Sequence, residues 1–600
     1  VKQLEQFLAY PAEDRQRQLF PGAAKPKQLQ LLTAKAKEEL AEGRKRISRL
    51  AAARRALATP EGKPFVWDVD FAEIFSDEKD GFDIVIGNPP YVRQESIAPP
   101  LMPRDRITTA AKRAYKEKLQ ASLLAHVGNK LPPKLDKKAD LYIYFFYHGL
   151  SLLNPEGTFC FITSNSWLDV GYGTQLQEFL LRNCHIKAII DNSAKRSFRE
   201  SDINTVISLF SAPVLRQADA LEESARFVMF KVPFEDTLST ETFKLIGEMQ
   251  QRVSTEQYRV FPRSQRFLLD EGWEYPEAYS EHQKRAYSFQ VGSYRGNKWG
   301  GKYLRAPDIF WTVLEKGKGK LVRLGQIARI RRGFTTGCNH FFYLDENALS
   351  EWRIEPRFLR PVLKSPKEVT AVYVRPGSLR TKLFCCDLPK SELRGTRALA
   401  YIEWGETQRS RGRQKQKAGI PWPELPTVSR RKFWYAIQMK EPGDFFCNRF
   451  FNERFFFCYA EGVVEDQTFY AGRLVKRDLA SEFYMGVLNC TLAYLSASLL
   501  GRVALGQGVL QYAVYEMSDL LVLNPWSLPV SDRPEVERCF NALKDRRVER
   551  VDTEVQQKDR RALDEVLFDS IGLSQGERDA VYEAVIDLVE SRLSKADSTG

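Results

Sequence analysis

The residues best suited to chemistry are Asn88, Pro89, Pro90 and Tyr91, which follow one another along the chain. Consecutive prolines fix φ and remove two amide donors, so this loop should be stiff and its carbonyl oxygens free to accept hydrogen bonds. An amide, free carbonyls and an aromatic face together suit a planar heterocycle that bears an exocyclic amine. We expect Asn88 and the Pro89 carbonyl to hold the amine and Tyr91 to stack on the ring. A proline turn that only closes a strand is the alternative.

An apolar strand should position this loop. Phe82 to Ile86 is a mostly apolar run that predicts a short buried strand, which Gly87 ends. Ligand sites in α/β proteins form beyond the carboxyl ends of such strands. The loop therefore stands where a ligand site is expected.

Helical and strand patterns alternate in the residues that follow. The predicted elements are a helix over 140–153, a strand over 158–163, a helix over 173–183, and strands over 186–191 and 205–210. This alternation indicates an α/β sheet with crossover helices. Before them, the polar and basic residues 92–138 predict either a loop that holds a phosphate backbone or an ordinary surface insertion.

With its strand, Asn88-Pro89-Pro90-Tyr91 resembles the catalytic motif of amino-methyltransferases. These enzymes move a methyl group from S-adenosyl-L-methionine (AdoMet) to an exocyclic nitrogen, most often N6 of adenine in DNA, although a similar tetrapeptide occurs in enzymes that act on RNA bases and on protein glutamine. Asp140-Leu-Tyr and Ser164-Asn-Ser-Trp resemble later motifs of this family, and the order of elements resembles the second half of its Rossmann-like sheet. The resemblance implies that Tyr91 stacks a flipped base. Phe198 is the candidate for the opposite face of that base, although an aromatic loop anchor would look the same.

The cofactor-binding half of that family is not evident here. Such enzymes use an early strand followed by a Gly-rich turn and then an acidic residue, but Gly22, Gly43 and Gly62 stand alone before the key strand. We therefore expect the AdoMet-binding half to precede Val1 in the parent protein or to lie on a partner chain. No cofactor-binding residue is assigned.

Basic and aromatic residues mark the second half of the chain. Leu324 to Gly333 resembles the opening of target-recognition domains in DNA methyltransferases and restriction specificity subunits. Cationic side chains for phosphates, interleaved with aromatic ones, are what DNA-reading loops need. An unrelated β-rich accessory domain is the alternative. The candidate DNA-binding residues are Arg329, Arg331, Arg332, Arg411, Arg413, Arg430, Arg431 and Lys432.

Composition sets further bounds. The 600 residues carry a net charge of +13, which favours a polyanionic partner. The nine cysteines form no CxxC pair and the five histidines are not spaced for a metal, so we expect reduced cysteines, a cytoplasmic location and no structural metal. The sequence contains no run of eighteen apolar residues, so no membrane span is predicted.

The predicted organisation has five parts. They are a charged helical segment (1–60), a methyltransferase catalytic half (61–235), a helical connector (236–320), a mixed α+β target-recognition domain (321–530) and a C-terminal helical region (531–600). Capping-box spacing of Ser574 and Glu577 predicts a helix start in the last part.

Together these features resemble large Type IIG-like restriction–modification methyltransferases and the related adenine methyltransferases of phage-defence systems. The resemblance implies AdoMet-dependent methylation of adenine N6 in double-stranded DNA, and leaves open a nuclease domain or partner subunit upstream or in trans. Two alternatives remain. One is a DNA-binding specificity portion without activity of its own, and the other is a methyltransferase that acts on RNA or protein.

Overall fold

The computed structural model describes residues 40–41, 67–75, 80–127, 135–198, 203–276, 279–286, 288–410, 419–439, 441–505 and 508–598. The chain divides into two compact units, Val1–Phe82 and Asp83–Gly600. In the first unit the described residues form the short helix α4 (Trp67–Asp70). The helices expected over residues 1–60 lie outside the described residues, apart from Leu40 and Ala41.

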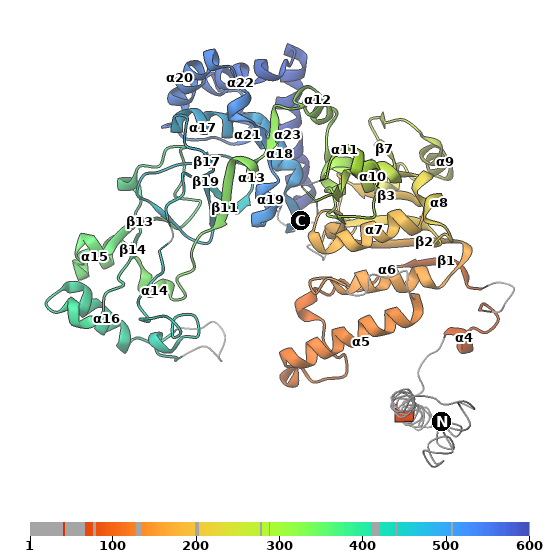
Figure 1. Cartoon of the computed structure of the whole chain (residues 1–600), viewed down its shortest axis with the longest axis horizontal. Helices are drawn as coiled ribbons and strands as arrows, with labels where there is room; N and C mark the ends of the chain where they lie inside the picture. The colour runs from red at the N-terminus through yellow and green to blue at the C-terminus, as the bar shows by residue number, and fades with distance from the viewer. Residues whose placement is uncertain are drawn as a thin grey trace, which may run out of the picture. The chain divides into compact units, whose positions relative to one another are not determined.

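A seven-stranded sheet forms the core of the first part of the larger unit, and its strand order is β1-β2-β4-β3-β5-β7-β6 (Figure 1). β4 runs antiparallel to both β2 and β3, whereas β3 and β5 are parallel. The α/β prediction is confirmed, with a mixed sheet. The strands are β1 (Phe82–Gly87), β2 (Leu153–Ser164), β3 (Ile186–Asn192), β4 (Thr205–Ser211), β5 (Ser224–Phe230), β6 (Val253–Ser254) and β7 (Tyr258–Ser264).

Aromatic packing holds helices against one face of this sheet. Phe146, fully buried in α6 (Leu141–Ser151), contacts the rings of Phe159, Phe161, Trp167 and Phe210. The helix α7 (Thr174–Asn183) joins the same hydrophobic core. On the other face, α9 (Thr240–Glu248) packs with residues of β3, β5 and β7 through Ile246. Helices therefore cover the first face of the sheet near α6, and α9 covers the second face over β3, β5 and β7.

Strand β1 differs from its prediction as a buried strand. Ile84 and Ile86 are 65% and 77% exposed, because only the face that carries Val85 packs toward α6. Among the described residues β1 also pairs with β2 alone, so its other edge is unpaired. The run is apolar on both faces, but only one face is covered.

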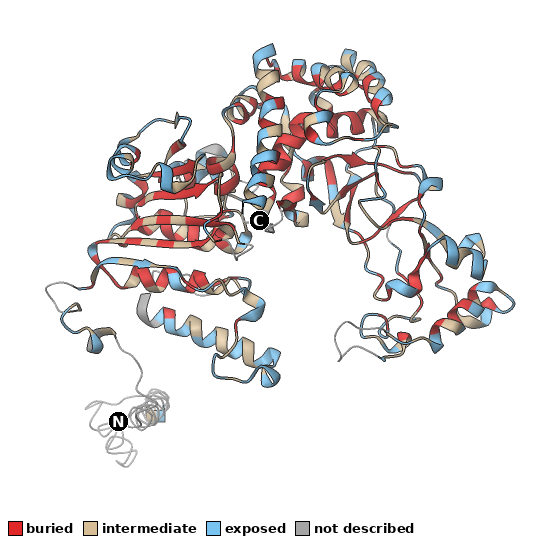
Figure 2. Cartoon of the chain, turned by 180° about the vertical axis from the view of Figure 1, so that it is seen from behind, coloured by how far each residue is buried: buried red, intermediate tan, exposed pale blue. Residues whose placement is uncertain are grey.

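The basic segment 92–138 is partly helical, and both its interpretations, a segment that holds a phosphate backbone and an ordinary surface insertion, stay predictions. It contains the 19-residue helix α5 (Thr109–Val127), which lies along α6 (Figure 1) and is largely exposed (Figure 2). The connector over 236–320 is mixed and largely helical, with α9, α10 (Gln265–Glu271) and α11 (Glu281–Ala286), but β6 and β7 also lie there and extend the sheet. The π-helix η7 (Gly300–Arg305) adds Tyr303 to the core of that sheet, and α12 (Asp308–Lys316) packs in the next core.

The second half is a mixed α+β region, as predicted. One four-stranded sheet has the order β11-β19-β15-β17 and another has the order β12-β14-β13-β18. These strands are β11 (Ala328–Arg332), β12 (Tyr343–Leu344), β13 (Leu359–Leu363), β14 (Lys382–Phe384), β15 (Phe445–Asn448), β17 (Phe457–Cys458), β18 (Val464–Glu465) and β19 (Phe469–Leu474). The helices α15 (Glu346–Trp352) and α16 (Arg397–Thr407) lie beside the second sheet (Figure 1).

The C-terminal helices are confirmed. α20 (Arg533–Leu543), α22 (Lys558–Ile571) and α23 (Gln575–Asp597) pack with α17 (Ser481–Leu488) and α18 (Thr491–Leu500). The capping box of Ser574 and Glu577 opens α23. Before them, Tyr512 leads into the helix α19 (Val514–Ser518), and the short strand β22 (Leu521–Leu523) follows.

All nine cysteines are free thiols, and most are buried as predicted. In the part of the chain that the structure describes, no cluster of His, Cys, Asp or Glu could hold a metal ion. Within the same residues no single helix is long and apolar enough to cross a membrane. The pair α17 and α18, bent by 51°, could do so by length and composition alone, and its residues are mostly buried in the fold.

Candidate active site

The loop after β1 begins at Gly87, which lies against the ring of Phe161. A Cβ at this position would stand 2.9 Å from Phe161 Cε1, so the strand can end here only with a very small residue. The side chain of Asn88 is exposed, and Pro89 is buried beneath it. The Val92 N–H donates to the Pro90 carbonyl at 2.9 Å, which corrects the expectation that both proline carbonyls are free. Among the described residues no backbone or side-chain donor to the Pro89 carbonyl is found.

Tyr91 is fixed at the end of this loop. Its hydroxyl donates to the carbonyl of Ile162 on β2 at 3.2 Å. Burial of the half-buried ring raises the pKa of Tyr91 to about 12, so the phenol stays neutral at physiological pH. The ring of Phe198, from the β3–β4 connection, lies 6.3 Å away, centroid to centroid, at an angle of 57°. The two rings proposed to stack a base are therefore brought together from distant parts of the sequence.

Asp140 ties the start of α6 to the loop that follows Tyr91. Its carboxylate accepts the Gln94 N–H at 2.8 Å and the Tyr172 hydroxyl at 3.0 Å. The N–H of Leu141, the first residue of α6, donates to the Val92 carbonyl at 3.0 Å. Burial raises the pKa of Asp140, and the two hydrogen bonds oppose that shift. The motif Asp140-Leu-Tyr thus fixes the loop that follows Tyr91 to the start of α6. We call these contacts of Asp140 and Leu141 the clamp.

The motif Ser164-Asn-Ser-Trp ends β2 beside the same loop. Ser164 caps the short 3-10 helix η4 (Asn165–Leu168) by accepting the Ser166 N–H. The Asn165 N–H donates to the carbonyl of Asn204 at 3.0 Å, close to the start of β4. This bond fixes the end of β2 to the connection that carries Phe198.

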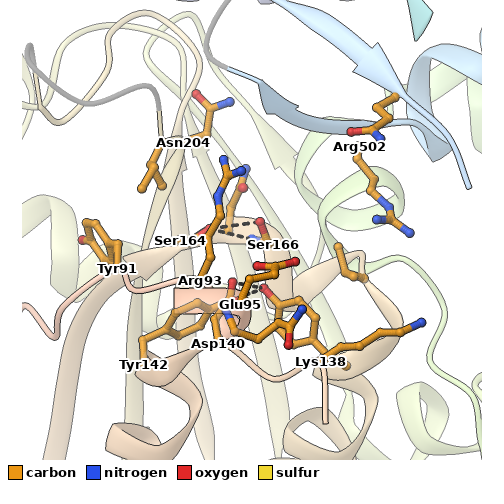
Figure 3. Close-up of a pocket in the computed structure, with 16 residues that line it drawn as sticks. Tyr91, Arg93, Glu95, Lys138, Asp140, Tyr142, Ser164, Ser166, Asn204 and Arg502 are labelled. Atoms are coloured by element: carbon orange, nitrogen blue, oxygen red, sulfur yellow. Dashed lines mark hydrogen bonds between the residues drawn. The ribbon is translucent and has the colours of Figure 1, made fainter. Parts of the chain in front are cut away.

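These elements surround a cavity of about 350 Å³, which Figure 3 shows with Tyr91 on one side and Arg502 on the other. Its lining includes Tyr91, Asp140, Ser164 and Asn204 from the sheet region. The opposite wall comes from β20 (Arg502–Leu505) and β21 (Val509–Gln511), through Arg502 and Gln511. Sequence patterns gave no sign of these two residues, because their proximity to the loop depends on long-range packing.

The candidate DNA-binding residues fall into two groups. Arg331 is ion-paired with buried Glu465, and Arg431 donates to the carbonyls of Thr336 and Ala436, so both guanidinium groups are engaged within their domain. The others that the structure describes, Arg329, Arg332, Arg430 and Lys432, are exposed, although Arg332 also donates to the Gln467 side-chain oxygen at 2.8 Å. Arg411 and Arg413 lie outside the described residues. Arg329 borders a basic hollow of about 430 Å³ with Arg473 and Arg477.

The fold is that of the second half of a Rossmann-like methyltransferase sheet, followed by a mixed α+β domain. Two protein-family models agree with this class. The Eco57I restriction–modification methylase matches residues 21–198, and the C-terminal domain of the Type II methyltransferase M.Eco57I matches residues 296–563. Over these two regions the chain is similar to Eco57I-type restriction–modification methylases.

Individual relatives of the chain are named as Type II methyltransferases. The chain is 26% identical over 210 residues to the Type II methyltransferase M.BstVI of Geobacillus stearothermophilus, covering 35% of this chain and 31% of that protein. It is 20% identical over 379 residues to the Type II methyltransferase M.AccI of Acinetobacter calcoaceticus, covering 61% of this chain and 56% of that protein. The matches thus span well under two thirds of these relatives.

Among solved structures, the Type IIL restriction–modification enzyme MmeI in complex with DNA is similar, with a TM-score of 0.47 and 12% identity. That match covers 87% of this chain and 59% of the other. The type IIG restriction endonuclease BpuSI is similar with a TM-score of 0.36 and 12% identity, covering 86% of this chain and 55% of that one. These scores are too low to add to the argument from the site.

The clamp at Asp140 predicts a local effect. Replacing Asp140 with Ala leaves the Gln94 N–H without its acceptor, a loss of about 1–3 kcal/mol for a buried group. We expect the Gln94 amide to exchange with deuterium about tenfold faster or more, measured by mass spectrometry on peptides that cover residues 91–97. The control is Asp136→Ala, because that carboxylate accepts from the nearby Lys138 N–H and, among the described residues, makes no hydrogen bond to the loop after Tyr91. Equal exchange in wild type and Asp140→Ala would contradict the clamp.

Proposed function

We propose that this chain is the catalytic and target-recognition portion of a site-specific DNA methyltransferase of a restriction–modification or phage-defence system. It would transfer a methyl group from AdoMet to N6 of adenine in double-stranded DNA. The observation that carries this proposal is the arrangement at the end of β1. There exposed Asn88 and then Pro89 directly precede Tyr91 in the chain, and the Tyr91 ring is paired with that of Phe198.

The acceptor groups of this loop favour an exocyclic amine as substrate. Adenine N6 carries two hydrogens, which the Asn88 side-chain oxygen and the Pro89 carbonyl can accept. Such contacts direct the nitrogen lone pair away from the loop, and positioning of this kind can supply much of the rate of a displacement reaction. Because N6 is paired inside a duplex, the base must first be flipped out.

Tyr91 and Phe198 would receive the flipped base. In the absence of a base the two rings contact each other at a tilt, so Phe198 has to move aside for a base to stack on Tyr91. The Tyr91 ring itself is held by its bond to the Ile162 carbonyl on β2. The loop after β1 is therefore the fixed side of the proposed base site, and the β3–β4 connection is the side that adjusts.

The described residues do not by themselves make an AdoMet site. No strand followed by a Gly-rich turn precedes β1 among them, and no side chain can be assigned to the donor. The unpaired edge of β1 and the exposed Ile84 and Ile86 are features that folded proteins normally cover. We propose that elements outside the described residues, in the same polypeptide or a partner chain, extend the sheet at β1 and bind the donor.

Target recognition is proposed for the second half. Exposed Arg329, Arg332, Arg430 and Lys432, together with Arg411 and Arg413, would contact DNA. Arg331 and Arg431, which are bound within the domain, would instead shape the loops that carry them. The uncovered edge of β1 also supports the second candidate function, in which this portion alone supplies specificity and another chain completes catalysis.

Asn88 tests the catalytic proposal. In the full-length protein, Asn88→Ala should lower N6-adenine methylation by about 100-fold or more, because the amine loses its fixed orientation. The measurement is single-molecule sequencing of host DNA together with methyl transfer in vitro. Asn347→Ala, an exposed asparagine on α15, is the control and should methylate as wild type does. Persistence of adenine methylation in Asn88→Ala would exclude the assigned role, and methylated RNA with unmethylated DNA would favour the RNA alternative.

Tyr91 tests the stacking role and its protonation state. Tyr91→Ala should lower kcat/KM by about 5- to 150-fold, corresponding to about 1–3 kcal/mol for base stacking. Tyr91→Phe keeps the ring and loses one hydrogen bond of about 0.5–1.5 kcal/mol, so a loss of about tenfold at most is expected. Because burial raises the pKa of Tyr91 to about 12, its ionisation should not affect the rate near the ordinary tyrosine pKa of about 10.

The pH–rate profiles of wild type and Tyr91→Phe should therefore have the same shape around the ordinary tyrosine pKa, whatever the difference in their rates. A decline in wild-type activity near the ordinary tyrosine pKa that is absent from Tyr91→Phe would contradict this. So would equal rates for Tyr91→Ala and Tyr91→Phe.

A further inference from the structure

The cavity beside Tyr91 has a wall that the catalytic sheet does not supply. Arg502, at the start of β20, borders the cavity opposite Tyr91 (Figure 3), and its side chain is 21% exposed. It lies more than 400 residues beyond Tyr91 in sequence, in the part of the chain that follows the two recognition sheets. An arginine in this position calls for an explanation, because none of the groups assigned to base binding requires it.

The Arg502 guanidinium is held rigidly. Its Nε donates to the carboxylate of Glu516 at 2.7 Å, and its Nη2 donates to the Tyr515 hydroxyl at 2.7 Å. The guanidinium also lies over the Tyr515 ring, 5.7 Å from its centroid. These bonds use only part of the N–H donors that a guanidinium offers. The group is thus pre-oriented, with capacity left for a ligand in the cavity.

The surroundings of Arg502 carry an excess of positive charge. Glu516 is fully buried, and its carboxylate pairs with both Arg502 and Lys298. Lys298 is further held by the carbonyl of Asp169 at 2.7 Å. Two cations around one carboxylate leave a net charge of about +1 next to the cavity. Arg93 and Lys138 add cationic groups to the lining, against the carboxylates of Glu95 and Asp140.

A flipped nucleotide brings its flanking phosphates to the site that receives its base. An oriented guanidinium binds a phosphate through two N–H donors, which gives both charge neutralisation and geometric selection. We propose that Arg502 binds a phosphodiester that flanks the flipped nucleotide, and that Glu516 and Lys298 are positioning residues for its guanidinium. This inference rests on the proposed function. It makes the β20–β21 hairpin part of the base-flipping site.

The same chemistry could serve a second anion, the carboxylate of the methyl donor. A contact to a DNA phosphate and a contact to the donor carboxylate predict different effects of salt on the affinity for DNA. A protein that neutralises one fewer DNA phosphate loses about 0.9 from the slope of log affinity against log salt concentration. Loss of a contact to the donor would raise the KM for AdoMet and leave that slope unchanged.

The test compares full-length wild type with Arg502→Met and Arg502→Lys, by duplex DNA binding in a salt series without AdoMet. Arg502→Met should bind more weakly, with a slope reduced by about 1. Arg502→Lys keeps the charge and should restore the slope while losing bidentate geometry. The control is Arg538→Met, because that exposed arginine pairs with Glu535 one turn away on α20. A wild-type slope in Arg502→Met, or an effect confined to the KM for AdoMet, would overturn the proposal.

A second measurement leaves the protein unaltered, in case Arg502→Met does not fold. Duplexes with a neutral methylphosphonate at single linkages around the target adenine are bound to wild-type protein. Neutralising a flanking linkage should reduce the slope by about 1, and where Arg502→Met folds it should have no further effect in that variant. Absence of any effect at the flanking linkages would overturn the proposal.

The outcomes for Arg502 and for methylation are separable. The salt slope requires no methyl transfer, so a reduced slope in Arg502→Met stands even if the wild type methylates no adenine. Conversely, wild-type methylation with an unchanged slope in Arg502→Met would retain the proposed function and remove the phosphate contact.

Discussion

The half-buried carboxylate of Asp140 is the contact on which the candidate site depends. Two prolines can stiffen Asn88–Tyr91, but stiffness alone does not fix where the loop points. Asp140 provides that by accepting the Gln94 N–H and the Tyr172 hydroxyl at once. The clamp is anchored in turn by α6, whose Phe146 is buried among aromatic rings of the sheet. The packing of α6 against the sheet therefore helps to fix the positions of the Asn88 amide and the Tyr91 ring.

The topology of the sheet explains why the second ring arrives at the same place. β4 is antiparallel to both β2 and β3, so the ends of β2 and β3 and the start of β4 lie at one edge. The β3–β4 connection must therefore pass that edge, and Phe198 lies on it. The hydrogen bond from Asn165 to the Asn204 carbonyl fixes the other end of this connection to β2. A pocket for a planar ligand follows from strand order as much as from the loop motif.

Local patterns allowed part of this to be predicted. Asn88–Tyr91 is a contiguous signal, Asp140-Leu-Tyr lies at a helix start, and Phe198 lies just before a strand, so each could be placed from its own neighbours. The exposure of Ile84 and Ile86 could not, because an apolar strand looks alike whether one face or both are covered. The helix α5 was not predicted because its apolar and charged residues are not clearly segregated onto opposite faces of the helix.

The environments of the remaining site residues could not be predicted from the sequence, because they depend on long-range contacts. Arg331 and Arg431 have the composition of DNA-reading residues, yet Glu465 and the carbonyls of Thr336 and Ala436 occupy their guanidinium groups. Arg502 shows the converse case: nothing adjacent in sequence marks it, and only the folded chain brings it to the cavity. Charge and composition favour a polyanionic partner, whereas the side chains that could contact it depend on tertiary neighbours.

Capture of a flipped base by Asn88 and Tyr91 is tested most directly by a structure of the full-length protein. The complex would contain a duplex with the target adenine and a non-reactive analogue of the methyl donor. The adenine should be extrahelical and stacked on Tyr91, with Phe198 displaced to its opposite face. Its N6 should lie within hydrogen-bonding distance of the Asn88 side chain and the Pro89 carbonyl. An adenine still stacked in the duplex, or bound away from this loop, would contradict the proposed function.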